Sequence, residues 1–323
     1  MALTIDDLGK VRLPKLPDAV PVFELAAPSL ASRRAGLARL ADVLGLGDLR
    51  AVELDPGVVL AGERGEIEFF GASGGVWARD ATAADEHKDE LRKWEGQQET
   101  KRGPQRVTLS ASASRRLIGE ARELLEATGL VGREAVAGEA VALDQVAQLD
   151  EKGKERKFGA GQATVKLSYA VEGLPVHGPG AKSLAFADPG RGGSARFTGA
   201  FHCWRTLGSA RTVKLPSVEA ALKAGLLVDP ELELYKKAGH SIRITRLELG
   251  YLALPAFLRQ SHLFPAFQVE GEVSKGKRGD GFRFGRYHHA LSPKAYAAAD
   301  LYGPYLAGNP DGIGPPPGRK TKR

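Results

Sequence analysis

The chain has 323 residues, a formal net charge of +7 and a single cysteine, Cys203. One cysteine excludes an intramolecular disulfide and a zinc site built from several thiolates. The length predicts two or three domains. The basic charge is widely spread and no recognition motif accompanies it, so it does not favour nucleic acid as a partner.

The N-terminal residues bear on the location of the protein. No apolar stretch follows a basic start, so the sequence carries no recognisable signal peptide and predicts a cytoplasmic protein. An extracytoplasmic location would require a leader that is missing from this sequence. The chain has no run of about 18 apolar residues, so no membrane span is predicted.

Two segments repeat a helical pattern that begins with the letters ASRR. Residues 31–46 and 113–130 both place leucines at helical spacing and both end on a glycine that suits a helix C-cap. A shorter example covers residues 216–227. The candidate N-caps are Ser29 or Ser32, Ser112 or Ser114, and Ser217. The sequence therefore predicts three helices that belong to an internal repeat.

Strand-like segments follow each helix. The predicted strands are residues 57–61, 66–70 and 75–78, then 140–149, 163–171, 183–187 and 194–201, and finally 241–251 and 262–273. Val165, Leu167 and Tyr169 alternate with polar residues, which is typical of a half-buried antiparallel strand. Near Thr245 the alternation slips, which indicates a β-bulge. We therefore expect an α+β fold of repeated modules, each with one helix packed on a three- to four-stranded antiparallel sheet.

The same pattern predicts four segments. Residues 1–105 form a helix–sheet module that ends in a charged linker, and residues 106–212 form the second module. Residues 213–292 form the third module. Residues 293–323 form a tail rich in proline and glycine, with a basic end.

The middle and third modules resemble a known group of bacterial domains. The turn motif in residues 165–197 is carried by Tyr169, Gly173, Pro175, Val176, Gly178 and Gly180. The paired strands that follow are carried by Tyr251, Ala253, Pro255, Gln260, Leu263 and Pro265. Over residues 107–275 the chain resembles PepSY domains and the fungalysin–thermolysin propeptide (FTP). The resemblance implies a helix on an antiparallel sheet and a role in inhibiting, chaperoning or binding another protein.

Possible catalytic and metal-binding residues are few. A His-Glu-x-x-His motif is missing from the sequence, which excludes a protease proregion in cis. His202 and Cys203 are neighbours on a predicted strand and point to opposite faces, so we expect a buried, inert thiol. Ser73 lies in a Gly-x-Ser-x-Gly sequence, but a strand follows it and a hairpin turn is the better interpretation. We expect no catalytic residues, metal or cofactor.

The remaining polar and aromatic residues suggest a binding surface. The candidate binding residues are Trp204, Arg205, Tyr251, Gln260, His262, Tyr287, His288 and His289. The favoured hypothesis is a non-catalytic module that binds a protein or peptide through free sheet faces and strand edges. One alternative is a structural subunit that assembles into a homo-oligomer. The other is an enzyme with a site between modules, near Tyr251, Gln260 and His288.

Overall fold

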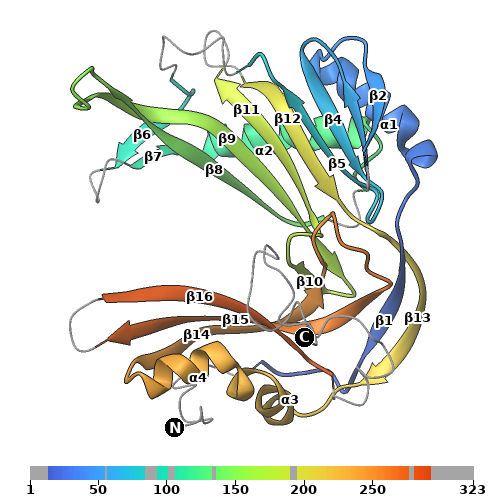
Figure 1. The fold of residues 1–323 in the computed structure, drawn as a ribbon, viewed down its shortest axis with the longest axis vertical. Coiled ribbons are helices and arrows are strands. Elements are labelled where there is room, and N and C mark those ends of the chain that lie inside the picture. Colours follow the sequence, from blue (N-terminus) through green and yellow to red (C-terminus); the bar gives the residue numbers. More distant parts are fainter. Residues whose placement is uncertain are drawn as a thin grey trace, which may run out of the picture. The chain divides into compact units, whose positions relative to one another are not determined.

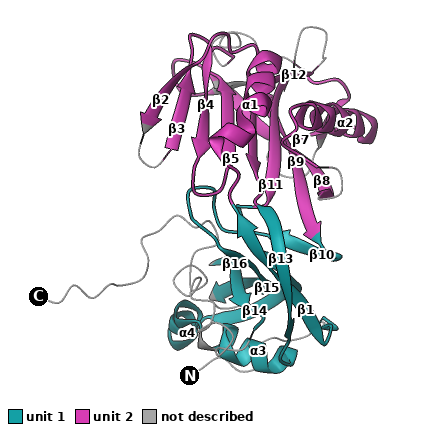
Figure 2. Ribbon diagram, turned by 90° about the vertical axis from the view of Figure 1, so that its right-hand side faces the viewer, with its two compact units in different colours: residues 1–26, 171–180, 206–323 teal, residues 27–170, 181–205 magenta. Residues whose placement is uncertain are grey.

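The computed structural model describes residues 14–54, 57–83, 93–100, 106–132, 136–189, 195–275 and 280–291. Two compact units form the chain (Figure 2). Unit 1 consists of Met1–Ala26, Val171–Gly180 and Thr206–Arg323, and unit 2 consists of Ala27–Ala170 and Ala181–Arg205. Each unit is therefore assembled from segments that are far apart in the sequence. The division at residues 105, 212 and 292 stays a prediction.

Unit 2 is built on one antiparallel sheet. Its strands, in spatial order, are β8 (Val136–Leu149), β9 (Glu155–Val171), β11 (Lys182–Pro189), β12 (Ala195–Cys203), β5 (Gly75–Asp80), β4 (Gly65–Phe70), β3 (Gly57–Ala61) and β2 (Arg50–Leu54). A separate two-stranded sheet pairs β6 (Gln97–Thr100) with β7 (Arg106–Leu109).

Both helices of unit 2 cover the same face of this sheet (Figure 1). Helix α1 (Leu30–Leu44) is capped by Ser29 and ends at Gly45, which has the positive φ of 64° that a glycine tolerates. Helix α2 (Ala111–Ala127) is capped by Ser110, a few residues before the predicted caps. Leucines of both helices join one hydrophobic core with the strands below them.

Unit 1 contains a mixed sheet and two short helices. The strand order is β13 (Thr206–Lys214), β1 (Ala19–Ala26), β15 (His262–Lys275), β14 (Ser241–Leu252) and β10 (Leu174–His177), and β16 (Asp280–His289) also pairs with β15. Strand β10 runs parallel to β14. Helix α3 (Val218–Ala224), the 3-10 turn η5 (Leu226–Val228) and helix α4 (Pro230–Lys237) pack on one face of the sheet (Figure 1). The bulge predicted at Thr245 is confirmed, because the register of β14 and β15 shifts between Ile244 and Arg246.

The predicted fold class is wrong. The described residues form fourteen strands connected as one mixed sheet, with four α-helices, and repeated helix-on-sheet modules are not formed. The two ASRR helices do not each cover a sheet of their own, because α1 packs on β4, β5 and β12 while α2 packs on β8 and β11 of the same sheet. The expectation of an α+β protein made of repeated PepSY-like modules with antiparallel sheets is therefore not met.

Parts of the sequence prediction fall outside the described residues. These parts are the tail at 293–323 and most of the charged linker before residue 105. Within the described part of the chain, none of the helices has the length and apolar content needed to cross a bilayer.

Candidate functional site

Strand β16 is a regular edge strand of unit 1. It pairs with β15 over ten consecutive positions, from Ala266↔His289 to Lys275↔Asp280, without a register shift. Its other side pairs with no strand of the described chain (Figure 1). A long edge strand without bulges can add a further strand, and most proteins protect such edges. Strand β8, one of the two edge strands of the unit 2 sheet, shows that protection, because its pairing with β9 shifts at three points.

The hydrogen-bond pattern shows which backbone groups of β16 face outward. Ala290 directly follows β16 and continues the register of its pairing with β15, and its amide donates to the carbonyl of Pro265 at 3.1 Å. In an antiparallel strand, the backbone N–H and C=O groups of every second residue face the same neighbouring strand. The backbone groups of the even-numbered residues of β16 therefore bond to β15, and those of the odd-numbered residues face the free edge. The N–H and C=O of Arg283 therefore face away from β15, and so does the N–H of Gly285.

A groove of about 510 Å³ lies beside this edge. It is lined by Thr245, Gln268, Glu270, Gly271, Glu272, Arg283, Phe284, Gly285, Arg286 and Tyr287. Because side chains alternate along a strand, Gln268, Glu270 and Glu272 of β15 point to the face opposite the helices. Gly285 pairs with Glu270 and contributes no side chain, so the sheet surface is open at that point.

Ion pairs occupy most of the charges in the groove. Arg243 pairs with Glu272 at 2.5 Å, and Arg246 pairs with Glu270 at 3.4 Å. Arg283 also reaches Glu272, but the contact is 3.6 Å long and the side chain of Arg283 is 89% exposed. An exposed pair of this kind contributes little stability. The guanidinium of Arg283 is therefore the charge in the groove that an incoming carboxylate can most easily engage.

Of the eight residues predicted from sequence, Tyr287 is the one that lines this groove. Its ring lies 6.4 Å from that of His177. Tyr251 is buried and its hydroxyl donates to the carbonyl of Pro21 at 2.8 Å, which ties β14 to β1. Burial also raises the pKa of this hydroxyl, with a smaller contribution from Glu172. Tyr251 is thus engaged inside unit 1.

Gln260 and the histidines also make internal contacts. The Gln260 amide accepts from Leu254 N at 2.8 Å and donates to Leu252 O at 2.8 Å and His262 O at 3.0 Å, which closes the loop between β14 and β15. The ring nitrogen Nδ1 of His262 bonds to the hydroxyl of its neighbour Ser261 at 2.9 Å. These contacts do not bring Gln260 and His262 into the groove.

His288 and His289 point to opposite faces of β16. His288 packs so closely on Gly225 that an added Cβ there would lie 3.1 Å from the Cβ of His288. Burial lowers the pKa of His288, although nearby Asp229 raises it. Burial, followed by the charge of His288, lowers the pKa of His289 to about 2. Both rings are therefore neutral at pH 7, with His288 buried and His289 partly buried.

The FHCWR segment contributes to a buried polar chain in unit 2. Arg33 lies 3.3 Å from His202 Nε2, His202 Nδ1 lies 2.9 Å from the Ser183 hydroxyl, and that hydroxyl lies 2.8 Å from the Tyr169 hydroxyl. Trp204 stacks on Tyr169 with ring centroids 4.6 Å apart. Arg205 is 2% exposed. The serine–histidine contact resembles a catalytic dyad, but Ser183 and His202 are 0% and 1% exposed, so no substrate reaches them.

Cys203 is a buried free thiol, as predicted. Burial raises its pKa, against the nearby charge of Arg205 and a hydrogen bond to Ser73. The thiolate is the reactive form of cysteine, so we expect native protein to resist labelling by an aromatic disulfide reagent at pH 8. Labelling should follow the unfolding of unit 2 as urea is added. Rapid stoichiometric labelling without urea would contradict this structure.

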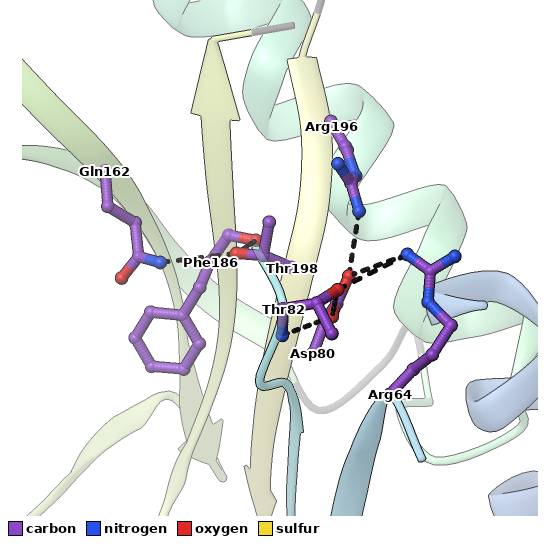
Figure 3. Close-up of polar contacts among 7 residues, drawn as sticks. All are labelled: Arg64, Asp80, Thr82, Gln162, Phe186, Arg196 and Thr198. Atoms are coloured by element: carbon purple, nitrogen blue, oxygen red, sulfur yellow. Dashed lines mark hydrogen bonds and ion pairs between the residues drawn. The ribbon is translucent and has the colours of Figure 1, made fainter. Parts of the chain in front are cut away.

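A second polar cluster closes the end of β5 (Figure 3). The buried carboxylate of Asp80 accepts from Arg196 Nη2 at 2.8 Å and from the amide and hydroxyl of Thr82 at 2.9 and 2.7 Å, and Arg64 lies 3.6 Å away. Burial by itself would raise the pKa of Asp80, but these hydrogen bonds and cations lower it below its ordinary value. The cluster joins β5 to β12 and to the turn before β4.

No group of three or more histidine, cysteine, aspartate or glutamate side chains among the described residues has the geometry to hold a metal ion.

Comparisons with known proteins give information about the fold and about no other property. No protein-family model and no curated protein matches the chain. Among solved structures, an uncharacterized protein from Eubacterium rectale is similar, with 10% sequence identity and a TM-score of 0.52 over 85% of each chain.

Proposed function

We propose that the chain is a non-catalytic peptide-binding protein and that an extended peptide adds to the free edge of β16. The observation that carries the proposal is the coincidence of a ten-position, bulge-free edge strand with a groove along its open face. Main-chain hydrogen bonds supply affinity in strand addition, and side-chain pockets supply specificity.

The chemistry of the groove suggests which peptide fits. A residue opposite Arg283 would be acidic, because opposite charges stabilise cross-strand pairs. A residue two positions away would lie opposite Gly285, where a large side chain fills the open surface above Glu270. We therefore propose a ligand with an acidic residue separated by one position from a bulky residue.

A proline substitution on the free edge of β16 tests this proposal. Arg283→Pro removes an outward N–H and leaves the bonds to β15 intact, because proline is tolerated on the free side of an edge strand. Arg283→Ala is the matched control, since it also removes the charge but keeps the N–H. Random dodecapeptides would be selected on the wild-type chain, and their affinities for both variants measured by calorimetry.

We expect selected peptides to bind Arg283→Pro at least about tenfold more weakly than Arg283→Ala, which corresponds to about 1.4 kcal/mol, the value of one or two hydrogen bonds. Far-UV circular dichroism would establish that both variants are folded. If no peptide is enriched, or if both variants bind the selected peptides equally well, strand addition at β16 is refuted.

A further inference from the structure

The sheet face of unit 2 that the helices leave uncovered carries an apolar stripe. The strand registers place five residues in one row across five neighbouring strands: Lys166, Leu184, Phe201, Trp77 and Glu68. The residues next to these five along each strand, such as Val165 and Ala200, belong to the core under the helices. Because side chains alternate between the two faces of a strand, the row of five lies on the opposite face. Trp77 is 39% exposed and Phe201 is 8% exposed, so Trp77 presents most of the open aromatic surface of this row.

The aromatic side chains form a preorganised cluster. The Trp77 ring lies 5.9 Å from the ring of Phe201 and 5.6 Å from that of Phe186. The Trp77 and Phe186 rings meet above Gly199 of β12. A side chain does not fit at Gly199, because an added Cβ would lie 2.7 Å from the carbonyl oxygen of Ala78. Large rigid side chains held in this way are typical of the centres of protein interfaces.

The charges at the two ends of the row are opposite and equally spaced from its centre. Lys166 lies two strands to one side of Phe201 and Glu68 lies two strands to the other. With strands about 4.8 Å apart, each charge lies about 10 Å from Phe201. Both side chains are exposed, and neither forms an ion pair within the described part of the chain. The neighbouring Glu66, in contrast, is paired with Arg79.

This row is complementary to itself when reversed. Consider two copies whose sheets face each other, related by a twofold axis that runs parallel to β12. This axis places Lys166 of each copy opposite Glu68 of the other, so the interface contains two such pairs. The same axis places Trp77 opposite Leu184, and Phe201 opposite its own counterpart. In the next row, Arg79 comes to lie opposite Phe186, a cation–π arrangement. Symmetric dimers require such a self-complementary patch, and aligned sheets commonly pack face to face.

We propose that two copies of this chain associate through this face of unit 2. The five strands span about 19 Å, so the buried area falls below the roughly 800 Å² per partner of a standard interface. An interface below that size is typical of weak, transient association, so we expect a weak dimer. The proposal goes beyond peptide binding and does not depend on it, because all of its residues belong to unit 2.

Charge exchange tests the dimer. In Lys166→Glu, two carboxylates face each other at both ends of the interface, and in Glu68→Lys two ammonium groups do so. Sedimentation equilibrium on the full chain should show that each single variant dimerises at least about tenfold more weakly than wild type. The double variant K166E/E68K restores both attractive pairs and should dimerise within about threefold of wild type.

Mixing the two single variants gives the sharpest outcome. In a heterodimer of Lys166→Glu with Glu68→Lys, both pairs are attractive, so an equimolar mixture should dimerise more strongly than either component alone. Trp77→Ala should also be monomeric, and unchanged circular dichroism would establish that it is folded. A wild-type chain that stays monomeric up to about 200 µM would overturn the proposal, because even a weak specific dimer is populated at that concentration. A mixture no more dimeric than its components would also overturn it.

Discussion

Replacing Arg286 with leucine is expected to lower the free energy of unfolding of unit 1 by about 3–5 kcal/mol. Arg286 and Asp229 are 5% and 3% exposed, and Arg286 Nε lies 3.5 Å from Asp229 Oδ2. The other end of the guanidinium pairs with Glu231. Removing the cation leaves the buried carboxylate of Asp229 uncompensated, which is the costly way to break a buried ion pair.

A second substitution separates this charge effect from lost packing. Asp229 also caps α4, because its Oδ1 accepts from the amides of Glu231 and Leu232 at 3.0 Å each. Asparagine keeps a capping oxygen without the charge, so adding Asp229→Asn to Arg286→Leu should recover about half of the loss. A double variant no more stable than Arg286→Leu would show that charge is not the cause.

The measurement must report on unit 1. All three tryptophans lie in unit 2, so urea unfolding would be followed by far-UV circular dichroism together with hydrogen exchange of the β15 and β16 amides. The matched control is Arg283→Leu, on the same strand but 89% exposed. It should change the stability by less than about 0.5 kcal/mol.

Acidification is expected to destabilise unit 2 through His202. Burial, with a smaller contribution from the charge of Arg33, lowers the pKa of His202 from 6.5 to about 3. Between these two values the unfolded chain binds a proton that the folded chain does not bind, so stability falls as the pH falls. From pH 7 to pH 5 this one residue should cost about 2 kcal/mol.

Tryptophan fluorescence follows unit 2 selectively and would provide the measurement. His202→Gln cannot take up the proton, so its stability should depend on pH less steeply than that of wild type, by about 2 kcal/mol over the same interval. His262→Gln, in unit 1, is the control and should leave this slope unchanged. Parallel curves for wild type and His202→Gln would mean that folding does not lower the pKa of His202.

Local sequence signals predicted the elements whose stability is local. The cap, the terminal glycine and the leucines of α1 are contacts within one helix. The structure selects Ser29 from the two candidate caps, ends the helix at Gly45 and confirms the buried leucines. The same holds for the alternation in β9 and for the bulge near Thr245. Eight elements of the described chain were missed: the strands β1, β2, β6, β7, β10, β13 and β16, and the helix α4. Strand β13 is mostly exposed and polar, and it is a strand because it pairs with β1 along its length.

The candidate site was predicted only in part. Tyr287 was predicted as a binding residue because it lies in a cluster of polar and aromatic residues. The strand that contains it, β16, was not predicted. A signal was present, because Phe282, Phe284 and His288 alternate with Arg283 and Tyr287 at the period of a strand. Two glycines in the same stretch obscured it. Whether an edge is free cannot be found in one strand's sequence, because it depends on which other strands pair with it.

By itself, the sequence determined three of the four described α-helices, most of the strands and the absence of an intramolecular disulfide, because these follow from capping, periodicity and composition. Only the tertiary structure decided that the two ASRR helices share one core. It also decided that Arg33 meets His202, 169 positions along the chain, and that Lys166 and Glu68 end the same row. Pairing between distant strands depends on how whole faces pack together, and no local pattern of residues records that choice.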